Sequence, residues 1–138
     1  MRPFNTGIEA PEKVVVDITN PVDWSTMDRV VTPPGSSAGE EIAKSAPQGA
    51  KVVKAFNTTF APTLVAGEAG GQQLDVLIAG DDEDAKKAVA ELVESGGLRA
   101  LDVGPLSKSR QLEQLGLFHI TAQEPLGAGF GSALKLHW

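Results

Sequence analysis

Three apolar runs in this sequence each end in a pair of small or polar residues. Each run reads as a short strand, and ligands bind along the edge where the carboxyl ends of parallel strands meet. Amide, hydroxyl and bare backbone groups at such an edge suit hydrogen bonds to a ribose or a carboxamide, but offer little for proton transfer. We therefore expect one polar rim formed by three pairs, Asn20-Pro21, Asn57-Thr58 and Gly80-Asp81.

The first pair allows two interpretations. Pro21 cannot continue the strand ladder and favours an extended conformation at Asn20. The pair could simply close the strand Lys13 to Ile18 with a turn, or it could present the Asn20 amide to a ligand. This motif alone does not decide between them.

Residues typical of acid–base or metal chemistry show no convincing pattern. His119 and His137 lie in late apolar segments, where a lone histidine is usually structural because a catalytic base needs a positioned partner. The acidic run Asp81 to Asp84 is explained by the start of a helix, where negative charge is favoured, and Lys86-Lys87 by a solvated helix face. We assign no catalytic residue and no metal ligand.

The glycines near the end of the chain form a separate candidate. Gly127, Gly129 and Gly131 lack the G-x-G-x-x-G spacing of a dinucleotide turn, and no strand leads into them. They could form a loop laid against a flat ligand, since glycine allows close backbone approach, or a flexible tail. Both interpretations stay open on this pattern alone.

The order of elements favours an α/β fold with a mainly parallel sheet and flanking helices. A leader, residues 1–12, lacks periodicity and is expected to be disordered, and a loop occupies residues 22–34. Residues 60–67 predict a short helix or turn and residues 68–73 a flexible surface turn. Strands are expected at 13–18, 51–56, 74–79 and 98–103, and longer helices at 37–46, 82–95 and from 107 or 109 to about 117.

Composition limits the classes of partner. The 138 residues suit one domain, which we place at residues 13–138, and the net charge of −6 argues against nucleic acid and anionic membranes as partners. With zero cysteines there is no disulfide framework, and no apolar run approaches the roughly 20 residues of a membrane span. No export signal opens the chain, so a cytoplasmic location is the default expectation.

Several successive strings resemble a known family over about residues 12–136. They are DITNP, GSSAGEEIAK, VVKAFNT, DVLIAGDDEDAKK, GLRALDVGPLSKSRQLEQLG and EPLGAGFGSALKL. The pattern resembles the reductases that pass hydride between NADPH and the deazaflavin coenzyme F-420, and is similar to the reductase domain of the six-transmembrane epithelial antigen metalloreductases. The combination of FNT with GDD and GPLS is the specific part.

The resemblance implies an oxidoreductase with a Rossmann-like fold and a small C-terminal glycine-rich extension. It implies two cofactors, NADP and coenzyme F-420 or another flavin-like acceptor. By the same resemblance, Asn20 and Pro21 lie near the nicotinamide, and the C-terminal loop containing Gly127, Gly129 and Gly131 contacts the deazaflavin. The segment expected to line both rings comprises Phe56, Asn57, Thr58, Thr59 and Ala61.

One part of the family pattern is not found in this sequence. The family begins with a strand, a G-x-G-x-x-G turn and a helix, and none of these is present. The chain resembles the C-terminal two thirds of such an enzyme, with an incomplete Rossmann-like sheet. Without the glycine turn we expect weak NADP affinity and a partial or crippled enzyme. The missing strands would leave Val14 to Ile18 as an exposed edge, which favours association, and we expect a homodimer.

Two other readings compete. Asn20-Pro21 also resembles lactate and malate dehydrogenases, but neither histidine lies in the G-x-H-G setting that this family requires. The stronger alternative is a non-catalytic remnant or dimerisation module that keeps the sheet and binds no dinucleotide.

Overall fold

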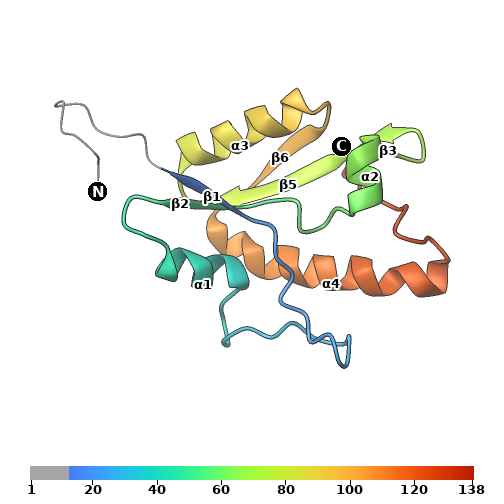
Figure 1. The fold of residues 1–138 in the computed structure, drawn as a ribbon, viewed down its shortest axis with the longest axis horizontal. Coiled ribbons are helices and arrows are strands. Elements are labelled where there is room, and N and C mark those ends of the chain that lie inside the picture. Colours follow the sequence, from blue (N-terminus) through green and yellow to red (C-terminus); the bar gives the residue numbers. More distant parts are fainter. Residues whose placement is uncertain (1–12) are drawn as a thin grey trace.

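Four short runs of mainly aliphatic residues pair into one sheet in the computed structural model, which describes residues 13–138 (Figure 1). The leader expected at residues 1–12 lies outside the described part. The strand order is β1-β2-β5-β6, with β1 parallel to β2 and β5 parallel to β6. The predicted α/β fold with a mostly parallel sheet is confirmed. The strands are β1 (Val14–Asp17), β2 (Lys51–Lys54), β5 (Asp75–Gly80) and β6 (Arg99–Gly104).

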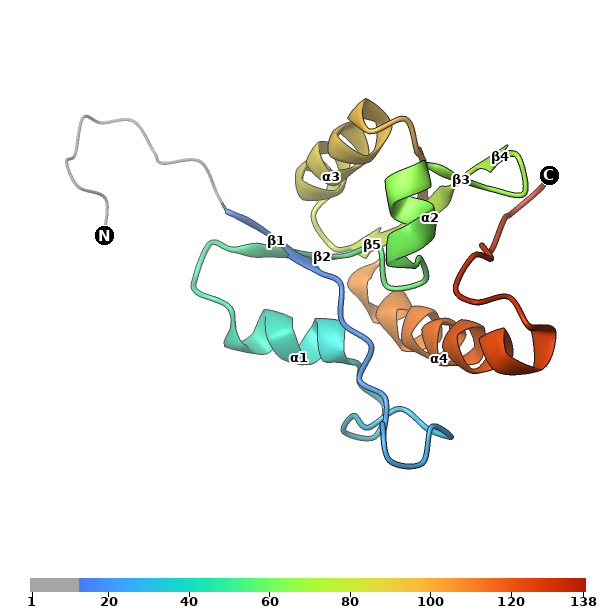
Figure 2. The same ribbon diagram turned by 45° about the vertical axis from the view of Figure 1, so that its right-hand side comes forward.

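Helices cover both faces of this sheet. Figures 1 and 2 show α3 (Glu83–Ser95) on one face, and α1 (Ala38–Ser45) and α4 (Ser109–Leu126) on the other. A 3₁₀ turn, Leu106–Lys108, leads into α4. Within residues 13–138, none of the helices has the length and apolar character needed to cross a membrane.

Local sequence signals explain where the helices begin. The Ser37 hydroxyl accepts a hydrogen bond from the Glu40 amide and starts α1. The Asp82 carboxylate accepts one from the Ala85 amide in the same way, so the capping role expected for the acidic run is confirmed at Asp82. Apolar side chains of α3, including Ala85, Val89 and Val93, then pack on β2 and β5 in the main core.

A short helix and a hairpin lie at one end of the sheet (Figure 2). Helix α2 (Ala61–Ala66) ends at Gly67, which adopts the left-handed conformation. The turn expected at residues 68–73 is a hairpin of β3 (Glu68–Ala69) and β4 (Gln72–Gln73). The last helix is longer than predicted, because it continues past Leu117 to Leu126.

The pairing of the central strands corrects one prediction. Strand β2 is antiparallel to β5, so Gly80 lies opposite Val53 and the chain leaves β5 toward the start of β2. At Gly80-Asp81 the chain therefore leaves the sheet in the direction opposite to that of β1 and β2, and this pair is not part of the rim where β1 and β2 end. The Asp81 carboxylate instead accepts a hydrogen bond from the Leu106 amide at the start of the 3₁₀ turn.

Two burial predictions are also wrong. An apolar run such as Lys13 to Ile18 favours a strand buried on both faces, but β1 forms an edge of the sheet and 38% of Val14 is exposed. The expected exposed edge at β1 is thus present in the described residues. Lys86, expected on a solvated face, is buried and pairs with the carboxylates of Glu83 and Asp102, whereas Lys87 is exposed.

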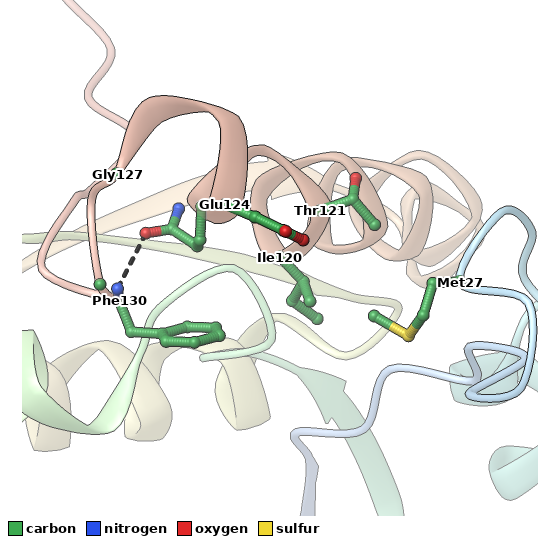
Figure 3. Close-up of a pocket in the computed structure, with 8 residues that line it drawn as sticks. Met27, Ile120, Thr121, Glu124, Gly127 and Phe130 are labelled. Atoms are coloured by element: carbon green, nitrogen blue, oxygen red, sulfur yellow. Dashed lines mark hydrogen bonds between the residues drawn. The ribbon is translucent and has the colours of Figure 1, made fainter.

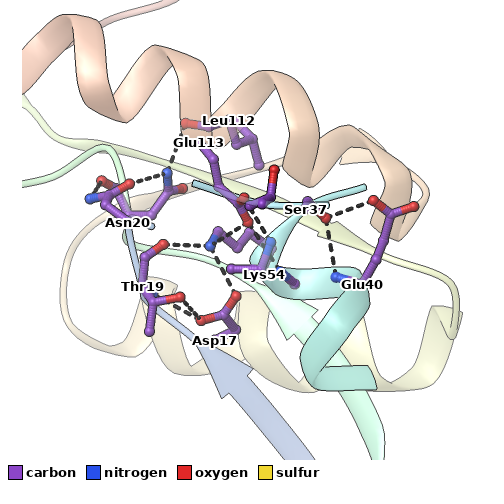
Figure 4. A network of polar contacts seen from close by, with 12 residues as sticks. Asp17, Thr19, Asn20, Ser37, Glu40, Lys54, Leu112 and Glu113 are labelled. Atoms are coloured by element: carbon purple, nitrogen blue, oxygen red, sulfur yellow. Dashed lines mark hydrogen bonds and ion pairs between the residues drawn. The ribbon is translucent and has the colours of Figure 1, made fainter. Parts of the chain in front are cut away.

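A buried lysine joins four elements on the α1 and α4 side of the sheet (Figure 4). The ammonium group of Lys54 in β2 lies 2.9 Å from a carboxylate oxygen of Asp17 in β1 and 2.9 Å from one of Glu113 in α4. The Glu113 carboxylate also accepts hydrogen bonds from the amides of Ala38 and Gly39, at the start of α1. The whole side chain of Lys54 is buried. Its charge is therefore balanced by protein groups rather than by water.

A second cluster of charges holds the C-terminal segment against the sheet. Asp75 at the start of β5 accepts hydrogen bonds from Arg99, Lys135 and the Leu136 amide. Burial of Asp75 opposes its ionisation, but these hydrogen bonds outweigh that effect and hold the pKa of the carboxyl well below its usual range. Arg99 also donates to the Leu136 carbonyl and lies over the Trp138 ring.

Replacing Lys54 should be strongly destabilising. The variant Lys54→Met leaves two buried carboxylates without their cation, and removing one partner of a buried ion pair costs about 3–5 kcal/mol. We expect a loss of that size in the free energy of unfolding measured by urea denaturation, against a change below about 0.5 kcal/mol for the exposed Lys87→Met. Equal stability of the two variants would contradict the central role of Lys54.

Candidate functional site

The two asparagines predicted at the sheet edge contact each other directly. The Asn20 amide nitrogen donates to the Asn57 carbonyl at 2.8 Å, and the Asn57 amide nitrogen donates to the Asn20 side-chain oxygen at 3.0 Å. Asn57 also donates to the Leu112 carbonyl of α4. The ends of β1 and β2 therefore share an edge, as the sequence predicted. The two side chains bind each other, however, and only 3% of Asn57 is exposed.

A glycine in α4 makes this arrangement possible. A Cβ at Gly116 would overlap the side-chain oxygen of Asn20 and lie 3.0 Å from the Asn57 amide nitrogen. The helix can approach the sheet edge this closely only because position 116 carries no side chain. The carbonyl of Leu112, one turn earlier, completes the contact.

The segment after β2 turns sharply above this pair. Phe56 has φ = 65°, a left-handed conformation that is uncommon for a residue other than glycine. Its carbonyl accepts hydrogen bonds from both the amide and the hydroxyl of Thr59, which closes the turn. Thr58 is buried, and Ala61 is exposed where it opens α2. The turn directs Phe60 toward the end of α4.

His119 joins this turn to the C-terminal loop. Its Nδ1 lies 2.9 Å from the Thr58 carbonyl and its Nε2 lies 2.9 Å from the Ser132 hydroxyl. A neutral ring that donates through Nδ1 and accepts through Nε2 satisfies both contacts. Burial lowers the pKa of His119, and the bond to the Thr58 carbonyl only partly opposes this. The structural role expected for His119 agrees with these contacts.

An open cavity of about 690 Å³ lies between the Met27 loop, the second half of α4 and the C-terminal loop (Figure 3). Its size is typical of pockets for small molecules. Most of the surface that lines it is apolar, and its polar residues are Thr121, Gln123 and Glu124. The lining residues are Met27, Ile120, Thr121, Gln123, Glu124, Gly127, Gly129 and Phe130.

The structure brings together some of the predicted site residues and separates others. Gly127 and Gly129 line the cavity, whereas Gly131 lines a different hollow beside Gln72 and Lys135. Asn20 and Asn57 pack beneath α4 and are not among the residues that line the cavity. Five other predicted residues, Pro21, Phe56, Thr58, Thr59 and Ala61, are likewise not part of its lining.

Sequence reasoning missed most of the cavity wall. Met27, Ile120, Thr121, Glu124 and Phe130 line it and were not selected. One signal was available, because Phe130 is an aromatic residue between two glycines of the selected cluster. The contribution of α4 could not be seen, because the helix was expected to end near Leu117.

The electrostatics of the cavity disfavour anions. Glu124 is the charged residue among those that line it, and no lysine or arginine is among them. Within residues 13–138, no group of three or more potential metal ligands is arranged to hold an ion. The cavity can therefore offer a largely apolar surface and the carboxylate of Glu124 to a ligand.

Comparison with known proteins finds similar reductases. No family model matches this sequence. The F-420-dependent NADP reductase of Methanocaldococcus jannaschii is 34% identical over 111 residues, which cover 78% of this chain and 49% of that protein. Metalloreductase STEAP3 of Rattus norvegicus is 35% identical over 105 residues, which cover 76% of this chain and 20% of that protein.

Solved structures agree. The crystal structure of a proposed F-420-dependent NADP reductase from Arthrobacter sp. FB24 matches with a TM-score of 0.80 and 34% identity, over 92% of this chain and 58% of that one. Over most of its own length, the chain is similar in sequence and fold to the F-420-dependent NADP reductases. A hypothetical protein of Sinorhizobium meliloti, SMa0349, matches with a TM-score of 0.62 and 36% identity, over 70% of this chain and 46% of that one.

The chain spans about half the length of the curated F-420-dependent relative that it matches, and a fifth of the metalloreductase. The resemblance stated from the sequence is thus confirmed for the family and for the Rossmann-like α/β fold.

A side chain at position 116 should separate α4 from the sheet edge. Gly116→Ala places a methyl group against the Asn20 and Asn57 side chains, and overpacking of this kind costs about 1–3 kcal/mol. We expect a loss of that size in the free energy of unfolding. The matched variant Gln114→Ala, at an exposed position of the same helix, should change it by less than about 0.5 kcal/mol. An unchanged Gly116→Ala would show that the close approach is not required.

His119 should make stability depend on pH. Its pKa is lowered in the folded protein, so the unfolded chain takes up a proton first as the pH falls below the ordinary value of about 6.5. The contribution of neutral His119 to the free energy of unfolding is therefore present above about pH 6.5. It is lost as the pH falls from there to the lower pKa of the folded protein. Urea denaturation from pH 7.5 to 5 should show a steeper loss for the wild type than for His119→Asn. The exposed His137→Asn should match the wild type, and equal slopes for all three would contradict the assignment.

Proposed function

We propose that this chain forms the ring-binding part of an NADP-dependent oxidoreductase that passes hydride between NADPH and coenzyme F-420 or a flavin-like acceptor. When bound, NADPH supplies the hydride, and the acceptor ring takes up that hydride together with one proton. The names and the likeness of the relatives support this activity for the family. The proposal for this chain depends on the cavity beside the C-terminal loop.

The residues of the cavity suit a flat, largely apolar ring. A volume of about 690 Å³ exceeds that of a single ring system, and the wall combines the Phe130 and Met27 side chains with the backbone of Gly127 and Gly129. Glycines at these positions let the loop approach a ring closely, and both have positive φ. This cavity is the single observation that carries the proposal.

Direct hydride transfer depends on placing two rings face to face more than on acid–base groups. In this chain His119 of α4 fixes the position of the loop that would hold one ring, because it contacts both the Thr58 carbonyl and the Ser132 hydroxyl. The turn that carries Thr58 is closed by hydrogen bonds from Thr59 to the Phe56 carbonyl. The Thr121 hydroxyl donates to the Leu117 and Phe118 carbonyls of α4, so it is held against its own helix.

The second cofactor has a less complete site in these residues. The sequence contains no G-x-G-x-x-G turn, and the cavity wall includes no cation that would hold a pyrophosphate. We propose that this chain by itself binds NADPH weakly and the acceptor ring more tightly.

The alternative function, a non-catalytic module that binds no dinucleotide, has specific support. The side chains of Asn20 and Asn57, expected near the nicotinamide, are used in binding each other. The exposed edge at β1 also supports association through the sheet, and we propose a homodimer.

A binding experiment distinguishes the two functions. The full chain is titrated with oxidised coenzyme F-420, followed by its visible absorbance, and separately with NADPH, followed by its fluorescence. We expect F-420 to bind with a dissociation constant on the order of micromolar and NADPH only near millimolar. The variant Ile120→Trp, which fills the cavity, should abolish the F-420 signal, while Gln114→Ala retains it. No response to either cofactor at millimolar concentration would favour the non-catalytic module.

A further inference from the structure

Phe130 occupies a special position in the wall of the cavity. Figure 3 shows its ring on one side of the cavity and the Met27 side chain across from it, with Ile120 of α4 between them. The ring is 46% exposed, although it is large and apolar. An exposed aromatic ring that lines a cavity offers a flat surface on which a second aromatic ring can stack.

The backbone holds Phe130 in a conformation that carries strain. Its φ is 62°, in the left-handed region, which residues other than glycine adopt only at an energetic cost. It follows Gly129, which has φ = 59°. A strained residue persists only where its surroundings determine its position, and such residues concentrate at ligand sites.

Two sets of contacts provide that support. The Phe130 amide donates to the Gln123 side-chain oxygen at 3.0 Å, and the Gln123 amide nitrogen donates to the Ser132 hydroxyl and the His119 carbonyl. The Phe130 ring also contacts the Phe60 ring edge-on, with 5.0 Å between the ring centroids. The Phe60 ring in turn packs against the His119 ring, with 4.3 Å between their centroids. Phe130 is therefore fixed through its backbone and through its ring.

The charge of the cavity determines which end of a ligand can enter. Glu124 contributes a carboxylate to the wall, and the chain as a whole carries a net charge of −6. A phosphate or carboxylate group would be repelled there, whereas an uncharged heteroaromatic ring would not.

We infer that Phe130 is the stacking platform that holds the ring of the ligand in this cavity, while the Glu124 carboxylate keeps the anionic tail of the ligand outside. This inference rests on the proposed function, because it specifies how the acceptor ring is held. It makes Phe130 a specificity-determining residue and Gln123 the residue that positions it.

The test compares substitutions at position 130 with a matched control. The probes are coenzyme F-420 and its deazaflavin ring fragment without the phosphodiester tail, each titrated into the full chain and followed by visible absorbance. Stacking on an aromatic side chain supports an expected five- to hundredfold increase in dissociation constant for Phe130→Ala and Phe130→Leu, with Phe130→Tyr within about threefold of wild type. Phe118→Ala, an exposed aromatic residue of α4 outside the cavity, should bind as the wild type does.

The ring fragment should bind within about threefold of the intact coenzyme. Wild-type affinity in both Phe130→Ala and Phe130→Leu, or a fragment that binds more than about a hundredfold more weakly than the coenzyme, would overturn the inference and leave the proposed function standing. Failure of the wild type to bind either probe would overturn the proposed function itself. If Phe130→Ala is unfolded by circular dichroism, the comparison of Phe130→Leu with Phe130→Tyr decides, since both keep a bulky side chain.

Discussion

The buried ammonium group of Lys54 is the constraint on which the described fold depends. A charge removed from water must be compensated within the protein, and Lys54 contacts two carboxylates from different elements, Asp17 and Glu113. Two carboxylates and one ammonium leave a net negative charge. The amides of Ala38 and Gly39 at the start of α1 donate to Glu113 and help to balance it. Strands β1 and β2 and helices α1 and α4 are thus held in one relative position.

This constraint reaches the sheet edge through the backbone. The Lys54 ammonium also donates to the Thr19 carbonyl at 2.5 Å, and Asn20 follows directly. Asp17 fixes the same turn by accepting hydrogen bonds from the amide and the hydroxyl of Thr19. The hydrogen bonds that Lys54 and Asp17 make with Thr19 therefore fix the backbone that carries Asn20 toward Asn57. Helix α4 is positioned both by its contact with these asparagines and by the ion pair of Glu113 with Lys54.

Much of the fold could be predicted from the sequence because local signals agreed with it. Apolar runs marked the four strands of the main sheet, and Ser37 and Asp82 marked helix starts by their capping chemistry. The direction of β5 could not be predicted, since strand patterns carry no information on whether neighbours run parallel. That is why Asp81 was placed at the wrong end of the sheet.

The site was harder to predict because tertiary contacts define it. The sequence KVVK suggests a lysine in water at each end of β2, and only packing shows that Lys54 is buried. Asp17 at the end of an apolar strand indicates a cation nearby, but one carboxylate cannot identify its partner. Asn20 and Asn57 were correctly expected to share an edge, and the structure adds that their side chains hydrogen-bond there.

The same reasoning explains why the cavity lies where it does. Charge compensation beneath α4 leaves the first half of this helix packed against the sheet, with Glu113 and Leu112 turned inward. Its second half extends beyond the sheet and meets the turn after β2 through His119. The part of α4 beyond the sheet needs another surface to cover its apolar side. The loop ending at Ser132 covers only part of that apolar side. The open part between that loop and Met27 is the cavity, so the length of α4 creates the space in which a ring can lie.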